Sequence, residues 1–230
     1  MSKFIQKMFT EVPRTYKLLN HLLTFGQDIV WRRRAARIAA ASGGTLWLDA
    51  CSGTGDMATC LSQLAKNGTS IVAIDFSLPM MSKAMKNSDV KRIAFTLADV
   101  GRLPFQENCF DGVIISFATR NINLTKDNLL TCLQEFYRVL KHDGQFVNLD
   151  TSQPKFAPIR WIFHLYIKLA VRPIGRMISG SDSAYAYLSH SMRRFYSPEK
   201  LAEIIHHAGF CEVCFKRVFF GAAAIHTAIK

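Results

Sequence analysis

The sequence predicts an α/β fold in which helices cover a mostly parallel, seven-stranded sheet. Three features carry this prediction: strand-like apolar runs that alternate with helical segments, a glycine-rich turn after the first run, and two neighbouring strand-like runs near the C-terminal end. Alternation of strand and helix implies parallel strands joined by right-handed crossovers. The last two runs flank Gly221 and predict an antiparallel strand that completes the sheet.

The individual elements follow from apolar periodicity and from glycine, proline and capping residues. We expect strands at 45–50, 70–75, 92–97, 110–117, 145–150, 211–219 and 222–229. We expect helices at 56–67, 78–86, 126–140 and 197–208, the last with Ser197 as its N-cap and Pro198 at its first position. Residues 1–42 predict an N-terminal helical cap, and 154–196 an apolar helical insertion. A chain of 230 residues is long enough for one such domain and short for two.

Composition limits the function classes without choosing one. The net charge of +12 attracts nucleic acid, anionic lipid or a phosphorylated substrate alike. Six scattered cysteines and the lack of an export signal predict a reducing, cytoplasmic location. The longest apolar stretch, 156–178, is interrupted by basic residues and is a poor membrane span. Cys211 and Cys214 should point to opposite faces of a strand, so we expect no metal site there.

A ligand-binding loop is predicted between the first strand and the helix that follows it. Gly53 and Gly55 permit a tight turn and let a ligand approach the free N–H groups of a helix N-terminus. Asp75 lies twenty residues beyond Gly55, at the end of the second strand, where it can accept both ribose hydroxyls of an adenosine. The spacing from Gly53 to Ala58 also fits a dinucleotide, so the loop alone does not identify the ligand.

Further acidic residues favour S-adenosylmethionine over a dinucleotide. Asp49 precedes the loop, where a carboxylate can orient the ammonium group of a methionine moiety. Asp56 places negative charge where a pyrophosphate would bind. After the third strand, Asp99 can accept from the adenine amino group while the N–H of Val100 meets a ring nitrogen. A glycine-rich turn without any ligand is the alternative.

With these residues the chain resembles the ubiquinone/menaquinone biosynthesis C-methyltransferases over nearly its whole length. The matching motifs are Tyr16 to Gly26 with Trp31-Arg32, Leu48 to Asp56, Asp75 to Met80, Ala98 to Phe105, Phe110 to Asn121, Tyr137 to Lys141, Tyr187 to Ser191 and Ala208 to Phe210. The resemblance implies a Rossmann-like class I methyltransferase that methylates a ring carbon of a polyprenylated quinol. It points to demethylmenaquinol, with the benzoquinol of the ubiquinone pathway left open. It also implies cofactor contacts from Thr54, Asp75, Phe76, Asp99, Val100 and Ser116.

Two positions depart from the family pattern. Ala118 stands where the family usually has glycine and could narrow the pocket by a methyl group. His142-Asp143 replaces Pro-Gly after Lys141, in a turn that we expect at the surface.

Arg120 and Asn121 follow the fourth strand and are the candidate catalytic residues. An arginine is almost always protonated, so we expect Arg120 to stabilise a phenolate electrostatically or through water, with Asn121 orienting it. On the residues alone, a surface loop pair is an equal alternative. Tyr187 and Arg193-Arg194 are weaker candidates, and Arg32-Arg33-Arg34 is more typical of a solvated helix face.

The apolar insertion also carries basic residues every fourth position, at Arg160, His164, Lys168 and Arg172. This pattern fits a helix that lies on an anionic membrane at its inner face or lines a groove for a lipid tail, and equally a core helix with a basic solvent face. The competing functions are an RNA methyltransferase, suggested by the charge, and a binding subunit without turnover. The apolar character of the aromatic stretch favours a lipid partner over nucleic acid. Whether the chain forms a homodimer is left open.

Overall fold

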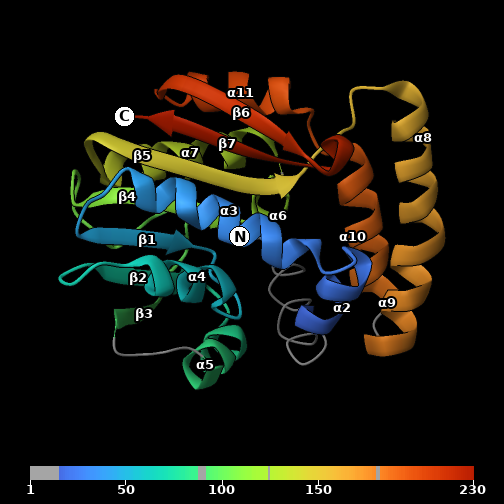
Figure 1. Cartoon of the computed structure of the whole chain (residues 1–230), viewed down its shortest axis with the longest axis horizontal. Coiled ribbons are helices and arrows are strands. Elements are labelled where there is room, and N and C mark those ends of the chain that lie inside the picture. The colour runs from blue at the N-terminus through green and yellow to red at the C-terminus, as the bar shows by residue number, and fades with distance from the viewer. Residues whose placement is uncertain (1–15, 88–91, 124, 180–181) are drawn as a thin grey trace.

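The computed structural model describes residues 16–87, 92–123, 125–179 and 182–230, and Figure 1 shows their arrangement. One sheet of seven strands runs through this part of the chain in the order β3-β2-β1-β4-β5-β7-β6. The strands are β1 Leu46–Ala50, β2 Ser70–Asp75, β3 Ile93–Leu97, β4 Phe110–Ser116, β5 Leu140–Thr151, β6 Cys211–Val218 and β7 Ala223–Ile229. The first five pair in parallel, and β7 pairs antiparallel with both β5 and β6. The predicted α/β fold is therefore confirmed.

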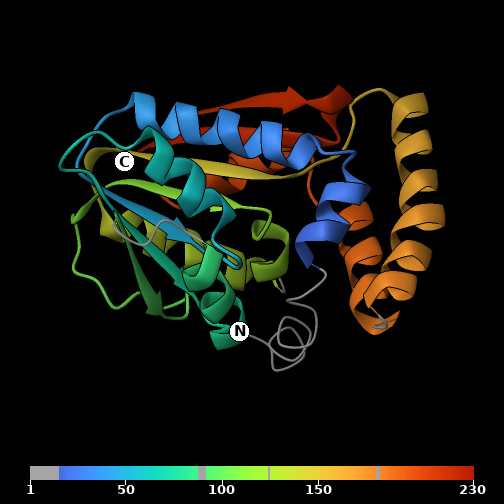
Figure 2. The ribbon, with the colours of Figure 1, turned by 60° about the horizontal axis from the view of Figure 1, so that its bottom comes forward.

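Helices cover both faces of this sheet (Figure 2). On one face, α3 (Gln27–Ala41) and α4 (Asp56–Leu64) bury an apolar stripe that includes Trp31, Ala35 and Met57. On the other face, α7 (Lys126–Val139) and α11 (Pro198–His207) pack through residues such as Phe136 and Ile205. The helix α5 (Leu78–Asn87) follows β2. The four-residue helix α6 (Thr119–Ile122) follows β4. The sequence did not predict α6.

A third cluster of apolar residues lies beyond the carboxyl ends of the strands. There α2 (Tyr16–Leu23) meets α8 (Ala157–Tyr166), a π-helical turn (Ile167–Val171), α9 (Arg172–Ser179) and α10 (Asp182–Arg194). The buried members of this cluster are Leu19, Ile167, Val171 and Tyr185. Figure 1 shows these helices standing beside the sheet rather than on either face of it.

Two expectations about element boundaries are wrong. The helix predicted to end at Leu140 ends at Val139, and β5 begins at Leu140 because this buried side chain pairs with Phe110 before the register shifts. Asp143, with φ of 61°, lies in this irregular stretch and is exposed, as expected for a surface turn. In the insertion the expected helical character is confirmed, because α8, the π turn and α9 follow one another without a gap and the residues at both ends of the π turn have right-handed helical angles.

Candidate active site

The site lies where β1 and β4 end, at the point where the strand order reverses. The chain runs outward from β1 to β3 and then returns to β4 on the other side of β1, and such a reversal is where open α/β sheets bind ligands. Each strand is followed directly by a left-handed residue that is not glycine, Cys51 with φ of 56° after β1 and Phe117 with φ of 55° after β4. Such conformations store about 1–3 kcal/mol each and are concentrated at functional sites. Together they turn the chain sharply around one cavity, the cofactor cavity, which both residues line.

The glycine-rich loop forms the floor of the cofactor cavity. Gly53, with φ of 56°, lines the cavity, and a Cβ built there would meet no atom within 4 Å. Gly55 is also left-handed and begins α4, although it does not line the cavity itself. The Thr54 hydroxyl donates to Asp56 Oδ2 at 2.8 Å, and both of these residues line the cavity. The loop thus leaves open space over its backbone, which a close-lying cofactor requires.

Asp75 ties the end of β2 to this loop. Its Oδ2 accepts the N–H of Gly53 at 2.9 Å and its Oδ1 accepts the N–H of Ser77 at 2.8 Å. Burial raises the pKa of this carboxyl group, while these backbone donors act in the opposite direction. Each carboxylate oxygen has a second lone pair, so both can still accept a ribose hydroxyl. Asp75, Phe76 and Ser116 all line the cofactor cavity.

Asp49 lies beneath the loop, fully buried and outside the lining of the cavity. Its Oδ2 accepts the Ser52 hydroxyl at 2.6 Å and the N–H of Ala58 at 2.9 Å. Its Oδ1 is buried without a hydrogen-bond partner among the described residues. Burial raises the pKa of Asp49 to about 7. An unsatisfied carboxylate oxygen fits a site that receives a cation such as the ammonium of S-adenosylmethionine.

The predicted adenine-binding residues lie in a neighbouring hollow. Asp99 and Val100 line this hollow, which shares Ile122 with the cofactor cavity. Asp99 Oδ1 accepts the N–H of Gly101 at 2.9 Å, which fixes the turn after β3. The two hollows together can hold a longer ligand than the cofactor cavity could hold by itself.

A second, apolar cavity of about 300 Å³ adjoins the first, and we call it the acceptor cavity. Its walls come from α2, α3, α8, the π turn, α10 and the short 3₁₀ helix at Phe219–Gly221. Arg32 and Phe117 line both cavities. Side chains with large exposed fractions, Phe25 at 71%, Ile162 at 59% and Phe220 at 76%, also line the acceptor cavity. The cavity is therefore bordered by apolar groups that reach the surface.

The candidate catalytic pair is buried on α6, so the alternative of a surface loop is wrong. Arg120 lines the acceptor cavity and Asn121 lines the cofactor cavity. Arg120 is also paired, because its Nη1 donates to Asp150 Oδ1 at 2.9 Å and its backbone N–H donates to Asp150 Oδ2 at 3.1 Å. Arg120 Nε has no partner among the described residues. Sequence reasoning missed Asp150, although its place at the end of the fifth predicted strand was a usable signal.

Arg32 corrects a second expectation. The sequence favoured a solvated face for Arg32-Arg33-Arg34, and Arg33 is indeed exposed, but Arg32 is buried. Its Nη1 donates to Asp28 Oδ2 at 2.6 Å, and its guanidinium lies 4.9 Å from the centroid of the Phe117 ring.

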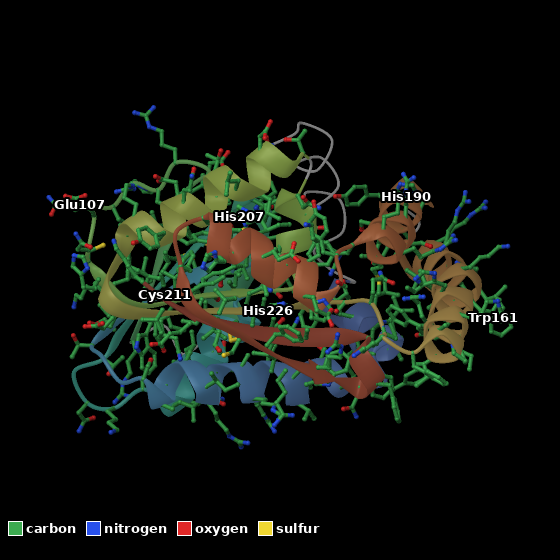
Figure 3. All side chains as sticks on the ribbon, turned by 90° about the horizontal axis from the view of Figure 1, so that it is seen from above. Glu107, Trp161, His190, His207, Cys211 and His226 are labelled. Atoms are coloured by element: carbon green, nitrogen blue, oxygen red, sulfur yellow. The ribbon has the colours of Figure 1, made fainter. Side chains whose placement is uncertain are left out.

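The remaining residues that the sequence singled out differ in burial and in whether they line a cavity. Tyr187 is half-buried, and burial raises its pKa while the charges of Arg120 and Asp150 also act on it. Arg193 and Arg194 are exposed and line neither cavity. Ala118 lines the cofactor cavity with φ of −122°, a conformation that does not require glycine. His226, a buried residue of β7, lines neither cavity, and its Nε2 lies 3.0 Å from the Pro198 carbonyl oxygen, a contact that ties β7 to α11 (Figure 3).

The sheet order, the antiparallel strand β7 between β5 and the edge strand β6, and the loop with Asp75 opposite it define a class I S-adenosylmethionine-dependent methyltransferase. The model of the ubiE/COQ5 methyltransferase family matches residues 1–230, and the chain belongs to this family. The chain is therefore an enzyme of the methyltransferase class with S-adenosylmethionine as its cofactor.

Individual relatives agree with this family. The demethylmenaquinone methyltransferase of Streptomyces avermitilis is 36% identical over 98% of this chain and 94% of its own. The demethylmenaquinone methyltransferase of Thermus thermophilus is 37% identical over 95% of this chain and 98% of its own. A solved SAM-dependent methyltransferase of Thermotoga maritima has the same fold, with a TM-score of 0.69, 16% identity and coverage of 98% and 99%. Membership of this family does not favour the alternative of an RNA methyltransferase.

Proposed function

We propose that the protein methylates a ring carbon of a polyprenylated quinol, with demethylmenaquinol as the acceptor. The observation that carries the proposal is the apolar acceptor cavity beside the cofactor cavity, with Arg32 and Phe117 in the wall between them. Where the two cavities adjoin, a methyl group leaving the cofactor would reach a ring held among the apolar side chains of the acceptor cavity. Relatives named demethylmenaquinone methyltransferase support the choice of acceptor.

The cofactor residues are assigned by the same proposal. Asp75 accepts the ribose hydroxyls, Asp99 and the Val100 N–H hold the adenine, and Asp49 attracts the ammonium group. Gly53, Thr54, Phe76 and Ser116 line the rest of the cofactor cavity, and Gly55 turns the chain from this loop into α4. S-adenosylmethionine, when bound, supplies an electrophilic methyl group on its sulfonium sulfur.

Arg120 has the chemistry that the acceptor needs. A quinol carbon becomes nucleophilic when a neighbouring hydroxyl loses its proton, so the protein must favour the phenolate. The unpaired Nε of Arg120 can donate to this oxygen, while Asp150 holds the rest of the guanidinium in place. Because Asp150 offsets part of the charge, the contribution of Arg120 is a directed hydrogen bond as well as a positive field. Asn121 borders the cofactor cavity on the same short helix.

The test is an incubation with labelled S-adenosylmethionine and either demethylmenaquinol or RNA. We expect label in the quinol only, and label in RNA alone would overturn the proposal. Arg120→Ala should lower turnover on the quinol by about 10²–10³-fold while cofactor affinity barely moves, as for loss of one preorganised donor. Arg193→Ala removes an exposed arginine that lines neither cavity, so it should leave turnover near normal. Normal turnover in Arg120→Ala would exclude Arg120 from the mechanism.

We also propose that the N-terminal cap and the insertion at 154–196 form one domain with the sheet, and that the insertion rests on an anionic membrane. No helix among the described residues is both long and apolar enough to cross a bilayer. α8 exposes apolar side chains such as Trp161, which is 66% exposed and labelled in Figure 3, and exposed basic residues occur in the same helical run at Arg160 and, in the π turn, at Lys168. The basic row is not continuous, because His164 is half-buried and its Nε2 lies 2.8 Å from Gln153 Oε1. A mixed apolar and basic surface is what an interfacial helix requires.

A further inference from the structure

Arg32 is a buried cation in the wall between the two cavities. It is contributed by α3, in the part of the chain before the first strand, and only 6% of it is exposed. It lines both the cofactor cavity and the acceptor cavity. A buried charge that borders a ligand site needs a partner of opposite charge, from the protein or from the ligand.

The protein supplies one partner, on the acceptor side. Arg32 Nη1 donates to Asp28 Oδ2, and Asp28 lines only the acceptor cavity. Asp28 is itself fixed, because the Thr24 hydroxyl donates to its Oδ1 at 3.1 Å and His21 Nδ1 lies 3.2 Å from the same oxygen. Burial raises the pKa of Asp28, but the charge and hydrogen bond of Arg32 outweigh it, so the group stays ionised. Among the described residues, no hydrogen bond involves the Nε or Nη2 of Arg32.

On the cofactor side, Arg32 interacts electrostatically with the buried carboxyl group of Asp49. The positive charge of Arg32 lowers the pKa of Asp49, but burial raises this pKa by more. The Oδ1 of Asp49 has no partner, and Arg32 has donors to spare. The methionine part of S-adenosylmethionine carries one ammonium and one carboxylate, which match this pair of charges. Arginine is well suited to bind a carboxylate with two parallel N–H groups.

We propose that Arg32 binds the carboxylate of the cofactor's methionine moiety, opposite the ammonium that Asp49 attracts. The N-terminal helix α3 then contributes directly to cofactor binding, and the bound carboxylate completes the partners of a buried guanidinium. This inference rests on dependence on S-adenosylmethionine and is independent of which acceptor the enzyme methylates.

The test compares ligands that differ only in the amino acid part, by calorimetry on the full chain. The probes are S-adenosylhomocysteine, its analogue without the carboxylate, and 5′-methylthioadenosine. The wild-type protein should bind S-adenosylhomocysteine at least tenfold more tightly than the analogue without the carboxylate. Arg32→Gln should lose at least tenfold in affinity for S-adenosylhomocysteine and bind these two ligands about equally, while the affinity for methylthioadenosine stays within about twofold.

The control is Arg33→Gln, which removes an exposed arginine from the same helix and should leave the discrimination unchanged. Arg32→Lys keeps the positive charge and should retain part of the preference for the ligand with the carboxylate. Equal binding of the two ligands by the wild-type protein would overturn the proposal, whatever the stability of the variants. So would an Arg32→Gln variant that keeps the wild-type preference for the carboxylate and only raises the KM for the quinol, because Arg32 would then act on the acceptor.

Discussion

At the residue scale, the site is a set of buried charges with defined partners. Asp75 accepts two backbone N–H groups, Arg120 is paired with Asp150, and Arg32 is paired with Asp28. Asp49 differs, because one of its oxygens is buried without a partner. Unsatisfied buried groups are costly in a folded protein and are retained where a ligand completes them.

Asp49 should make cofactor binding depend on pH. Its folded-state pKa of about 7 lies above the ordinary 3.8, so below pH 7 the carboxyl is largely protonated and attracts an ammonium group less. Affinity for S-adenosylhomocysteine should therefore rise between about pH 5 and pH 8, as the proton leaves. Calorimetry across this range measures the change. In Asp49→Asn, the rise should disappear, because the amide can accept from Ser52 and Ala58 but carries no charge.

The same raised pKa has a consequence for stability without ligand. The folded protein binds the Asp49 proton more strongly than the unfolded chain does, so stability falls as pH rises from about 4 to about 7. Asp49→Asn should therefore raise the Tm of the ligand-free protein at pH 8 relative to wild type, with little difference at pH 4.5. An equal difference at both values would mean that Asp49 does not hold this proton.

Asp75→Ala should weaken binding of S-adenosylmethionine by about 1.5–3 kcal/mol, the range for hydrogen bonds to a charged group. Part of the loss would come from the loop itself, because the N–H of Gly53 loses its acceptor. Calorimetry measures the affinity. An affinity equal to wild type would remove Asp75 from the ribose site.

At the element scale, the insertion is held together by close helix packing. A Cβ at Gly175 in α9 would lie 2.1 Å from Cγ of Tyr185 in α10, so only a glycine allows this approach. The π turn before α9 keeps Ile167 and Val171 buried in the same cluster as Tyr185. Leu188 and Met192 of α10 line the acceptor cavity. The shape of this cavity therefore depends on how closely α10 packs against α9.

Gly175→Ala should destabilise the protein by about 1–3 kcal/mol through overpacking. For a chain of this size that corresponds to a fall in Tm of roughly 2–4 °C per kcal/mol. The KM for a long-tailed quinol should rise, while affinity for S-adenosylhomocysteine should change little because the cofactor cavity lies elsewhere. In a Tyr185→Ala background the same substitution should cost less, since the clashing ring is gone. Equal costs in both backgrounds would contradict this account.

At the scale of the whole molecule, the two ends of the fold differ. The sheet end carries the cofactor cavity, whereas α2, α8 and α10 border the acceptor cavity, and α2 and α8 expose apolar side chains such as Leu22 and Trp161. The net charge of +12 adds a general attraction to anionic surfaces. This arrangement suits an acceptor whose ring must reach the cofactor while its tail remains in a lipid phase.

The proposed membrane contact predicts reversible binding to anionic vesicles. Changing Arg160, Lys168 and Arg172 together to Gln should weaken this binding more than tenfold, since each basic residue near an anionic surface contributes about 1 kcal/mol. The apparent KM for a long-tailed quinol should rise, and activity on a short-tailed soluble analogue should change little. Co-sedimentation at low and high salt measures the effect, because ions screen the attraction.

A matched control changes three exposed basic residues outside the insertion, Arg37 on α3, Lys66 after α4 and Lys86 on α5, to Gln (Figure 1 shows these elements). This variant has the same net charge and should bind vesicles more tightly than the first. If both variants bind equally, only overall charge matters. If the wild-type protein does not bind anionic vesicles at low salt, the insertion has a basic solvent face and no membrane contact.

The sequence by itself determined the strand order along the chain, the cofactor loop and the position of Arg120 at a strand end. These features are local: apolar periodicity, left-handed glycines and an acidic residue at a fixed distance act over one strand and one helix. Sequence reasoning also identified Asp75, because the carboxyl ends of neighbouring parallel strands must meet at one edge.

Only the tertiary structure decided which charges are buried and paired. Asp150 meets Arg120 because β4 and β5 lie side by side, and Arg32 is buried because α3 packs on the sheet with its guanidinium over Phe117. The π turn and the contact between Gly175 and Tyr185 depend likewise on which helices pack together. A run of three arginines has the same local pattern whether one of them is solvated or buried. The free energy of burying a charge is set by partners that are distant in sequence, so local patterns could not reveal it.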